Sequence, residues 1–390
     1  MLRATKVRIY PTSEQAEFLD RQFDAVRFVW NKALAIKVHY YKVRGQSLSP
    51  KKHLKPLLAK AKKSRKYSWL KNADSIALQQ ATINLDTAFQ NFFNPKLQAR
   101  FPRFKKKHGK QSSYHCTSVS VGDNGIKIPK CKPIRAKVHR EIVGKVKSIT
   151  LSRTLTGKYF ASILADDTQE QPKQIDNLEA NQVVGVDMGI TDLAITSTGH
   201  KTGNPRFLKK AQRNLKRKQQ ALSRCKKGSK GRHKARLLVA KAHERVAFAR
   251  NDFQHKLSKQ LIDENQAVIV ETLKVKNMLK NKRLARSIAD AGWHSLITKL
   301  EYKAKQEGKH LVKIDQWFAS SKTCSVCDLK QEKMPLRIRS WECSCGAIHD
   351  RDINAARNIK KQGILKLKAE GLSVSADGGL RKSGRLSVAA

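Results

Sequence analysis

The sequence predicts a multidomain α/β protein, and three observations indicate that class. In the N-terminal half, segments with the alternating apolar pattern of strands flank a long stretch with helical spacing. In the C-terminal half, strongly apolar strand-like runs alternate with long helical stretches, which is typical of a sheet with parallel strands. Four clustered cysteines near the C-terminus predict a small metal-held domain. The 390 residues suffice for two or three domains of about 100–200 residues each.

The N-terminal elements are expected to be one strand followed by helices. Residues 1–10 alternate as a short strand that carries Val7 and Ile9 on one face. Thr12 and Gln15 then have the spacing of a capping box, so we expect a long helix to begin there. A second helix is expected over 72–93, because its apolar residues also recur at helical intervals.

A β-rich segment follows these helices. Hairpins are expected over 118–128 and 145–166, because in each of them two alternating runs flank a turn that contains glycine. Together with the strand at 1–10 these hairpins predict a small β domain, into which the helical part of the chain is inserted.

The C-terminal half is expected to form a separate α/β domain. Residues 183–199 combine an apolar strand, a glycine turn and a second strand, and a basic helical stretch, 207–263, follows. The continuous β-branched run at 267–272 predicts a strand buried on both faces. Further helices are expected over about 284–307 and over 354–371, beyond which few apolar residues remain and disorder is expected.

The charge of the chain predicts a polyanionic partner. There are 81 Lys and Arg against 31 Asp and Glu, a net charge of +50. Repulsion on this scale opposes compaction unless a polyanion binds. The basic residues gather in 51–66, 101–110 and 206–236. Each segment alone could equally be a solvated surface that binds nothing. Together they predict nucleic acid as the partner.

Other features argue against a membrane or secreted protein. The chain has no run of about 18 apolar residues, and its N-terminus lacks the apolar core of a signal peptide. Its seven cysteines do not have the pattern of a secreted disulfide framework. We therefore expect a cytoplasmic, nucleoid-associated protein with reduced thiols and no membrane partner.

Cys324, Cys327, Cys343 and Cys345 predict a structural zinc site. The two thiolate pairs are separated by 15 residues and can meet around one tetrahedral zinc, as in a zinc ribbon. The second pair is Cys-x-Cys, which tightens its turn and leaves His349 as an alternative ligand. Four protein ligands leave no open position, so this zinc is expected to hold the fold and not to catalyse. The other cysteines are interpreted as packing residues: Cys116, Cys131 and Cys225.

Several acidic residues lie in apolar strands or at a helix start, where a buried negative charge needs a cation or hydrogen-bond donors beside it. Asp187 interrupts the apolar run VVGVDMGI and Glu271 ends AVIVE, positions where burial is costly without a counter-charge or metal. Asp350 and Asp352 open the last helix, where one of them can act as a cap. Taken alone, each acid could equally be a capping or turn residue or part of a functional site.

Together these acids match a ribonuclease H-like fold, in which an Asp, a Glu and an Asp from two strands and a final helix meet at one point. Such a cluster suits two Mg²⁺ ions about 4 Å apart that act on a phosphodiester.

The chain resembles the TnpB (OrfB) family of bacterial insertion sequences, which is related to type V CRISPR effectors. The resemblance covers nearly the whole chain and rests on the segments GVDMGITDLA, VIVETLKVKNM, SSKTCSVC, ECSCGAIHDRDINAARNI and FPRFKKK. It implies an endodeoxyribonuclease with a single RuvC active site. Such an enzyme takes a guide RNA from the end of its transposon and cuts double-stranded DNA beside a short adjacent motif by Mg²⁺-dependent hydrolysis. The oligomeric state stays open, with one chain per RNA favoured.

The resemblance also assigns residues and domains. It implies Asp187, Glu271 and Asp352 as catalytic Mg²⁺ ligands, with Asp350 as the fallback for the third acid. The domains it implies are a wedge-like β-barrel (1–10 and 105–170), a helical recognition domain (11–104), a RuvC domain (171–319 and 347–370), a zinc ribbon (320–346) and a disordered tail (371–390).

Basic side chains in this architecture are expected to contact phosphates of RNA or DNA, without distinction between the two. The candidates are Lys51, Lys52, Arg103, Lys105, Lys106, Lys107, Arg213, Arg217, Arg232 and Arg236. Aromatic residues are candidates for base stacking or motif reading, although helical spacing favours a core role for those in the first helix: Tyr10, Phe28, Trp30 and Tyr40.

Three alternatives remain. A catalytically silent RNA-guided repressor is disfavoured by the presence of all three acids, and a strand-transfer transposase by the lack of a nucleophilic tyrosine motif. A plain RNase H or junction resolvase needs neither the helical domain nor so much positive charge. The sequence does not determine the guide RNA, the adjacent motif or the cut position.

Overall fold

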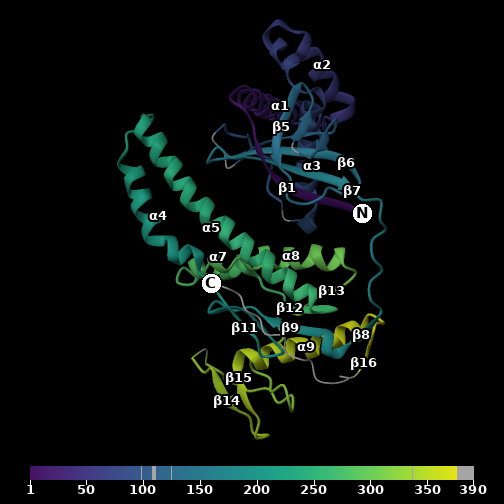
Figure 1. Cartoon of the computed structure of the whole chain (residues 1–390), viewed down its shortest axis with the longest axis vertical. Helices are drawn as coiled ribbons and strands as arrows, with labels where there is room; N and C mark the ends of the chain where they lie inside the picture. The colour runs from purple at the N-terminus through teal and green to yellow at the C-terminus, as the bar shows by residue number, and fades with distance from the viewer. Residues whose placement is uncertain (98, 108–110, 124, 336, 376–390) are drawn as a thin grey trace. The chain divides into compact units, whose positions relative to one another are not determined.

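The computed structural model describes residues 1–97, 99–107, 111–123, 125–335 and 337–375 (Figure 1). The chain divides into two compact units, Met1–Glu170 and Gln171–Ala390. None of the described helices is long and apolar enough to cross a bilayer.

The N-terminal unit contains a seven-stranded antiparallel sheet in the order β2-β6-β7-β1-β5-β4-β3. Its strands are β1 (Leu2–Tyr10), β2 (Gln111–Cys116), β3 (Ser120–Gly122), β4 (Gly125–Ile128), β5 (Cys131–Lys137), β6 (Lys145–Thr154) and β7 (Tyr159–Asp166). Both expected hairpins are present, as β3–β4 and β6–β7. Strands β2 and β5 were not expected.

The sheet curls strongly, as its connections require. Its two edge strands, β2 and β3, follow one another in the chain with only residues 117–119 between them. Such a connection reaches less than about 15 Å, whereas a flat sheet of this size would be about 29 Å wide. The opposite edges of the sheet therefore lie near each other.

Helices cover this sheet and share its core. They are α1 (Ser13–Arg44), η1 (Pro50–Leu54), α2 (Lys55–Lys63), η2 (Arg65–Asn72), α3 (Ser75–Phe93) and η3 (Pro95–Leu97). The predicted capping box is confirmed, because Gln15 N donates to Thr12 Oγ1 at 3.3 Å and Thr12 N donates to Gln15 Oε1 at 3.0 Å. Leu19 and Phe23 of α1 pack in one cluster with Ile149 and Ile163 of the sheet. The start of α1 and the sheet thus share one core, whereas Trp30 and Leu34 of α1 form a second cluster with Leu85 of α3.

The C-terminal unit contains a mixed five-stranded sheet in the order β11-β10-β9-β12-β13. Its strands are β9 (Val183–Asp187), β10 (Asp192–Thr196), β11 (Lys201–Gly203), β12 (Ala267–Glu271) and β13 (His310–Ile314). Strands β9, β12 and β13 are parallel, whereas β10 is antiparallel to β9 and to β11. The carboxyl ends of the three parallel strands therefore meet at one edge of the sheet. The sequence did not predict β13, whose run HLVKI is short and contains two polar residues, His310 and Lys313.

Helices pack on both faces of this sheet (Figure 1). They are α4 (Phe207–Arg224), α5 (Lys230–Asp263), α6 (Val275–Met278), α7 (Ala285–Ala291), α8 (Trp293–Gln306) and α9 (Arg351–Ala369). Val184 and Val268 face the cluster formed with α5, α7 and α8, and the alternate residues Val183 and Ile269 face α9. The strands are apolar on both faces because both faces are covered.

Two glycines allow α9 to lie very close to the sheet. A Cβ added to Gly185 of β9 would lie 2.1 Å from the carbonyl oxygen of Ala356, and one added to Gly363 of α9 would lie 2.0 Å from Ile269 Cδ1. Any larger residue would push the helix away. These contacts bring the middle of α9 close to β9 and β12.

The prediction that residues 371–390 are disordered is wrong for the first part of this tail. Ser373–Ser375 form β16, which pairs in parallel with β8 (Asn177–Glu179). Leu372 and Val374 pack against the same cluster as Leu178, and these apolar anchors explain the order. The rest of the predicted disordered tail, 376–390, lies outside the described residues.

Candidate active site and metal centre

Two of the predicted acids end neighbouring parallel strands. Asp187 is the last residue of β9 and Glu271 the last of β12. The register pairs Val186 with Val270, so the two carboxylates follow side by side at the carboxyl edge of the sheet. Asp352 lies in the first turn of α9, the helix that the glycine contacts hold against β9.

The three carboxylates form one electrostatic cluster. Burial raises the pKa of Asp187 to about 7, and the negative charges of Glu271 and Asp352 contribute to this rise. Burial also raises the pKa of Glu271, although a hydrogen bond donated by Ser320 Oγ at 2.5 Å acts in the opposite direction. A bound cation would compensate the negative charges that act on Asp187, and carboxylate oxygens are ligands that suit Mg²⁺.

Asp350 has a different role from Asp352. Its Oδ1 accepts hydrogen bonds from the backbone N–H groups of Asp352 and Ile353, at 3.0 and 3.1 Å, and thereby caps α9. Its Oδ2 pairs with Lys201 Nζ at 2.6 Å. Burial acts to raise its pKa, but the contacts with Lys201 and with these N–H groups outweigh it and lower the pKa. Both oxygens of Asp350 are therefore engaged in structure. Asp352 pairs with Arg339 through one oxygen, at 3.4 Å, and its charge acts on Asp187, so it is the better candidate for the third acid.

The four predicted cysteines form a group that fits a metal ion. The sulfurs of Cys324, Cys327, Cys343 and Cys345 all lie within 4.8 Å of one another. The second pair lies in the turn between β14 (Ser340–Glu342) and β15 (Ile348–Asp350). His349, the alternative ligand, lies outside this group, with its Nε2 3.0 Å from Cys324 Sγ. Four thiolates around one point are a donor set typical of structural zinc.

Hydrogen bonds connect this cysteine group to the acid cluster. Asn354 Nδ2 of α9 donates to the Thr323 carbonyl at 2.7 Å, and Asn358 Nδ2 donates to the Ser320 carbonyl at 2.8 Å. Ser320 in turn donates to Glu271. Sequence reasoning missed Ser320 and both asparagines. The spacing of the asparagines, four residues apart on a helix that begins at a candidate acid, was the available signal.

Replacing Cys324 by Ser is expected to lower zinc content and thermal stability together, because one of the four thiolates is lost and the metal-bound fold is stabilised by the metal. Metal analysis should give about one zinc per wild-type chain and much less in the variant. Cys225→Ser, which changes a cysteine outside the group, is the control and should keep its zinc. Unchanged zinc in Cys324→Ser would contradict the assignment.

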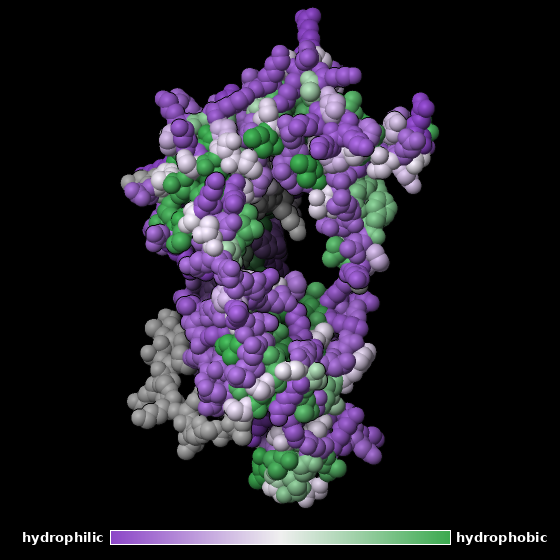
Figure 2. All heavy atoms as spheres, turned by 90° about the vertical axis from the view of Figure 1, so that its right-hand side faces the viewer, coloured by the Kyte–Doolittle hydropathy of each residue, from purple (hydrophilic) through white to green (hydrophobic). Residues whose placement is uncertain are grey.

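The expected phosphate contacts are exposed, with one exception. Lys51, Lys52, Arg103, Lys105, Lys106, Lys107, Arg213, Arg217 and Arg236 all have exposed side chains. Arg232 is half-buried, and its Nη1 donates to the carbonyls of Leu222 and Cys225 at 3.0 and 3.1 Å, so it caps the C-terminus of α4. Hydrophilic residues cover most of the face drawn in Figure 2.

Among the aromatic candidates, Trp30 does not serve base stacking. It is 8% exposed, and its Nε1 donates to the Arg103 carbonyl at 3.1 Å, so it belongs to the core as helical spacing favoured. Tyr40 packs partly against the same cluster as Trp30. Tyr10 is 43% exposed, and Phe28 is half-buried beside other rings.

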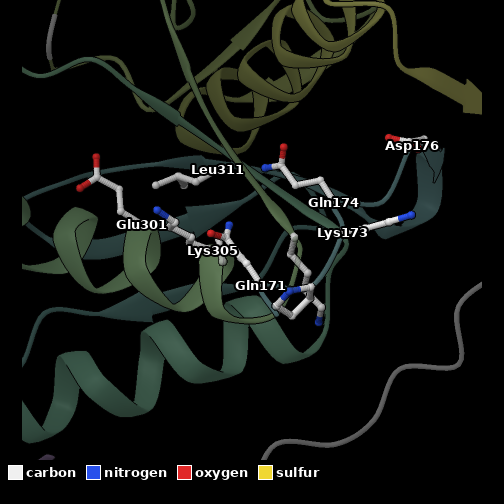
Figure 3. A pocket seen from close by; sticks show the side chains of 10 residues that line it. Gln171, Lys173, Gln174, Asp176, Glu301, Lys305 and Leu311 are labelled. Carbon is white, nitrogen blue, oxygen red and sulfur yellow. The ribbon is translucent and has the colours of Figure 1, made fainter. Parts of the chain in front are cut away.

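A hollow of about 620 Å³ in the C-terminal unit is not lined by any of the candidate acids. It lies beside Lys309 and Leu311, at the amino end of β13, whereas the acids lie at the carboxyl ends of the parallel strands. Figure 3 shows Glu301 and Asp176 on opposite sides of this hollow, so its acidic groups do not converge.

Family models match three parts of the chain. The OrfB_IS605 model, described as "Probable transposase", matches residues 168–282 and therefore includes Asp187 and Glu271. The Cas12f1-like TNB domain model matches 293–359, which includes the cysteine group and Asp352. A model described as a helix-turn-helix domain matches 1–46, where this structure has β1 and α1.

Similar proteins extend over almost the whole chain. A Streptomyces pristinaespiralis protein named "Putative RNA-guided DNA endonuclease" is 40% identical over 367 residues, which cover 93% of this chain and 89% of that protein. An Escherichia coli K12 protein, "Putative RNA-guided DNA endonuclease InsQ", is 29% identical over 98% of this chain and 96% of its own length. A solved structure of a Cas12f1–sgRNA–target DNA complex matches the fold with a TM-score of 0.58 at 13% identity, over 92% of this chain and 98% of that one. This chain belongs to the TnpB (OrfB) family.

Proposed function

We propose that this protein is an RNA-guided DNA endonuclease encoded by a transposable element. The observation that carries the proposal is the cluster of Asp187, Glu271 and Asp352 at one sheet edge, in a chain with a net charge of +50. The names of its relatives supply the substrate class, a DNA target selected by a guide RNA.

In this proposal the three acids are the Mg²⁺ ligands of a RuvC-type, RNase H-like site. When bound there, two Mg²⁺ ions would activate the attacking water and stabilise the leaving oxygen of the phosphodiester. Ser320 holds the Glu271 carboxylate in place, and the cap made by Asp350 fixes the helix turn that presents Asp352. Because the pKa of Asp187 is raised to about 7, a cation bound beside it would favour its ionised form near neutral pH.

The rest of the chain is proposed to hold the nucleic acids and the zinc. The division is a RuvC domain (171–319 and 347–370), a zinc ribbon (320–346), a wedge-like β domain (1–10 and 105–170) and a helical recognition domain (11–104). The exposed basic side chains of α4, α5 and 101–107 would neutralise phosphates, while pairing of the guide RNA with the target supplies sequence specificity. The protein would act in the cytoplasm, on DNA of the nucleoid.

Cleavage of a plasmid library tests this function. The protein is purified with RNA expressed from its own transposon end and mixed, in Mg²⁺, with plasmids that carry a guide-matched target beside a randomised flank. We expect linear product that depends on the RNA and that is enriched for one flanking motif. Specific binding without any linear product would instead favour the silent RNA-guided repressor.

A further inference from the structure

One face of α1 lines a pocket that the active site does not use. Asp24, Phe28, Asn31 and Ala35 recur at helical spacing, and together with Trp69 of η2 they border a cavity of about 500 Å³. Its lining also includes Arg27, Lys32 and Phe104. A volume of this size is within the range of pockets that take small ligands.

The pocket has aromatic walls that remain accessible. The ring of Phe28 lies 5.3 Å from that of Trp69 and 5.4 Å from that of Tyr67, measured between centroids. Trp69 is nevertheless 42% exposed and Phe104 60% exposed. No ring of the described residues lies against Phe104 in this structure. Aromatic surface of this extent on both sides of a pocket indicates a binding site.

The exposed position of Phe104 is held by the residues on either side of it. The Arg103 carbonyl accepts a hydrogen bond from Trp30 Nε1 at 3.1 Å. Lys105 is held twice by the amide of Asn31, which accepts from its N–H at 2.7 Å and donates to its carbonyl at 3.0 Å. Phe104 is therefore fixed beside α1 without a partner ring that would explain its position.

The rim of the pocket is cationic. Arg27 Nη2 and Lys107 Nζ lie 2.5 and 3.5 Å from the two oxygens of Asp24, and the Lys32 side chain is exposed nearby. The lining thus has two cations, Arg27 and Lys32, and one carboxylate, and Lys107 pairs with that carboxylate from outside the lining. An aromatic slot with positive charge at its edge matches a nucleotide, because the base can stack on the rings while its phosphate meets the cations. An apolar peptide segment would not use this charge.

We propose that this pocket binds one unstacked nucleobase of the bound nucleic acid, held against the rings of Trp69 and Phe104. The proposal rests on the nucleic-acid binding proposed above. The base can come from the RNA or from the DNA, since both present the same flat aromatic surface.

Binding measurements with matched variants test the pocket. Phe104→Ala and Trp69→Ala are each expected to weaken binding about tenfold, equivalent to about 1.4 kcal/mol of lost stacking. The labelled transposon-end RNA is the probe in one arm, and a guide-matched DNA duplex added to the protein–RNA complex is the probe in the other. A loss in the first arm assigns the base to RNA and a loss in the second assigns it to DNA; both support the pocket. Tyr41→Ala removes a ring that is 62% exposed on the same helix but outside the pocket, and should bind as the wild type does.

Photo-crosslinking of the wild-type complex gives an independent result. Ultraviolet irradiation followed by protease digestion and mass spectrometry should find nucleotide adducts on the peptides that contain Trp69 or Phe104. Tight wild-type binding with unchanged affinity in both variants, and with adducts only elsewhere, would overturn the pocket and leave the proposed function intact. Wild-type protein that binds neither RNA nor DNA would overturn the proposed function, and the pocket with it.

Discussion

Asp187→Ala is expected to lower the rate of DNA cleavage by at least about 10³-fold, while the affinities for RNA and target DNA stay close to those of the wild type. The reason is that Asp187 lies beside Glu271 and interacts with Asp352, so its loss removes one ligand of the proposed Mg²⁺ site. It does not alter the exposed basic side chains that would contact phosphates. Single-turnover cleavage and filter-binding assays measure the two effects separately.

Asp315→Ala is a matched control for this experiment. Asp315 follows β13, the strand next to β12, so it lies at the same edge of the sheet, but its side chain is exposed and accepts a hydrogen bond from Trp317 N. Its replacement should leave cleavage unchanged. If Asp187→Ala cuts at the wild-type rate, the assignment of the active site is wrong.

Asp187→Asn is expected to stabilise the protein at neutral pH when Mg²⁺ is absent. The folded state raises the pKa of Asp187 from 3.8 to about 7, so between these values the folded protein binds a proton that the unfolded chain has released. The free energy of unfolding of the wild type should therefore fall as the pH rises from about 4 to about 7, by up to about 4 kcal/mol from this group. An uncharged asparagine avoids this loss.

Thermal unfolding from pH 4 to 8 measures this effect. The buffer should be free of Mg²⁺ but contain no chelator, so that zinc is retained. Adding Mg²⁺ at pH 8 should raise the unfolding temperature of the wild type more than that of Asp187→Asn. Only the wild type has a carboxylate at this position that can bind the cation. If the unfolding temperatures of the two proteins change with pH in parallel, the raised pKa of Asp187 is not the cause of the loss of stability.

The candidate site residues could be singled out in the sequence because they break the local pattern. Asp187 and Glu271 stand out against β-branched runs, and the strand order that brings them together follows from the hairpin and helices between them. The cysteine pairs are likewise visible by spacing alone, and their sulfurs meet as expected. Capping preference alone leaves Asp350 and Asp352 open, and the preference for Asp352 comes from the family resemblance; the structure adds that Asp350 is the cap of α9.

The features that could not be predicted depend on contacts between distant segments. The basic run around Arg232 predicts a phosphate contact. In the structure, however, the turn between α4 and α5 places its guanidinium against the carbonyls at the end of α4. Trp30 and Phe104 are both aromatic residues near basic segments, but Trp30 packs in a cluster between helices and donates to the Arg103 carbonyl, whereas Phe104 is 60% exposed. The short strands β5 and β13 acquire their structure from neighbours in their sheets.

The most direct test of RNA-guided cleavage is an exchange of guides. Two complexes are prepared with RNAs that differ only in the guide segment, and each is offered two plasmids that carry one or the other matching target beside the same flank. Our account predicts that each complex linearises only its matching plasmid and that Asp187→Ala linearises neither. Cleavage of the same plasmid by both complexes, or of both plasmids by each, would contradict the claim that the RNA selects the target.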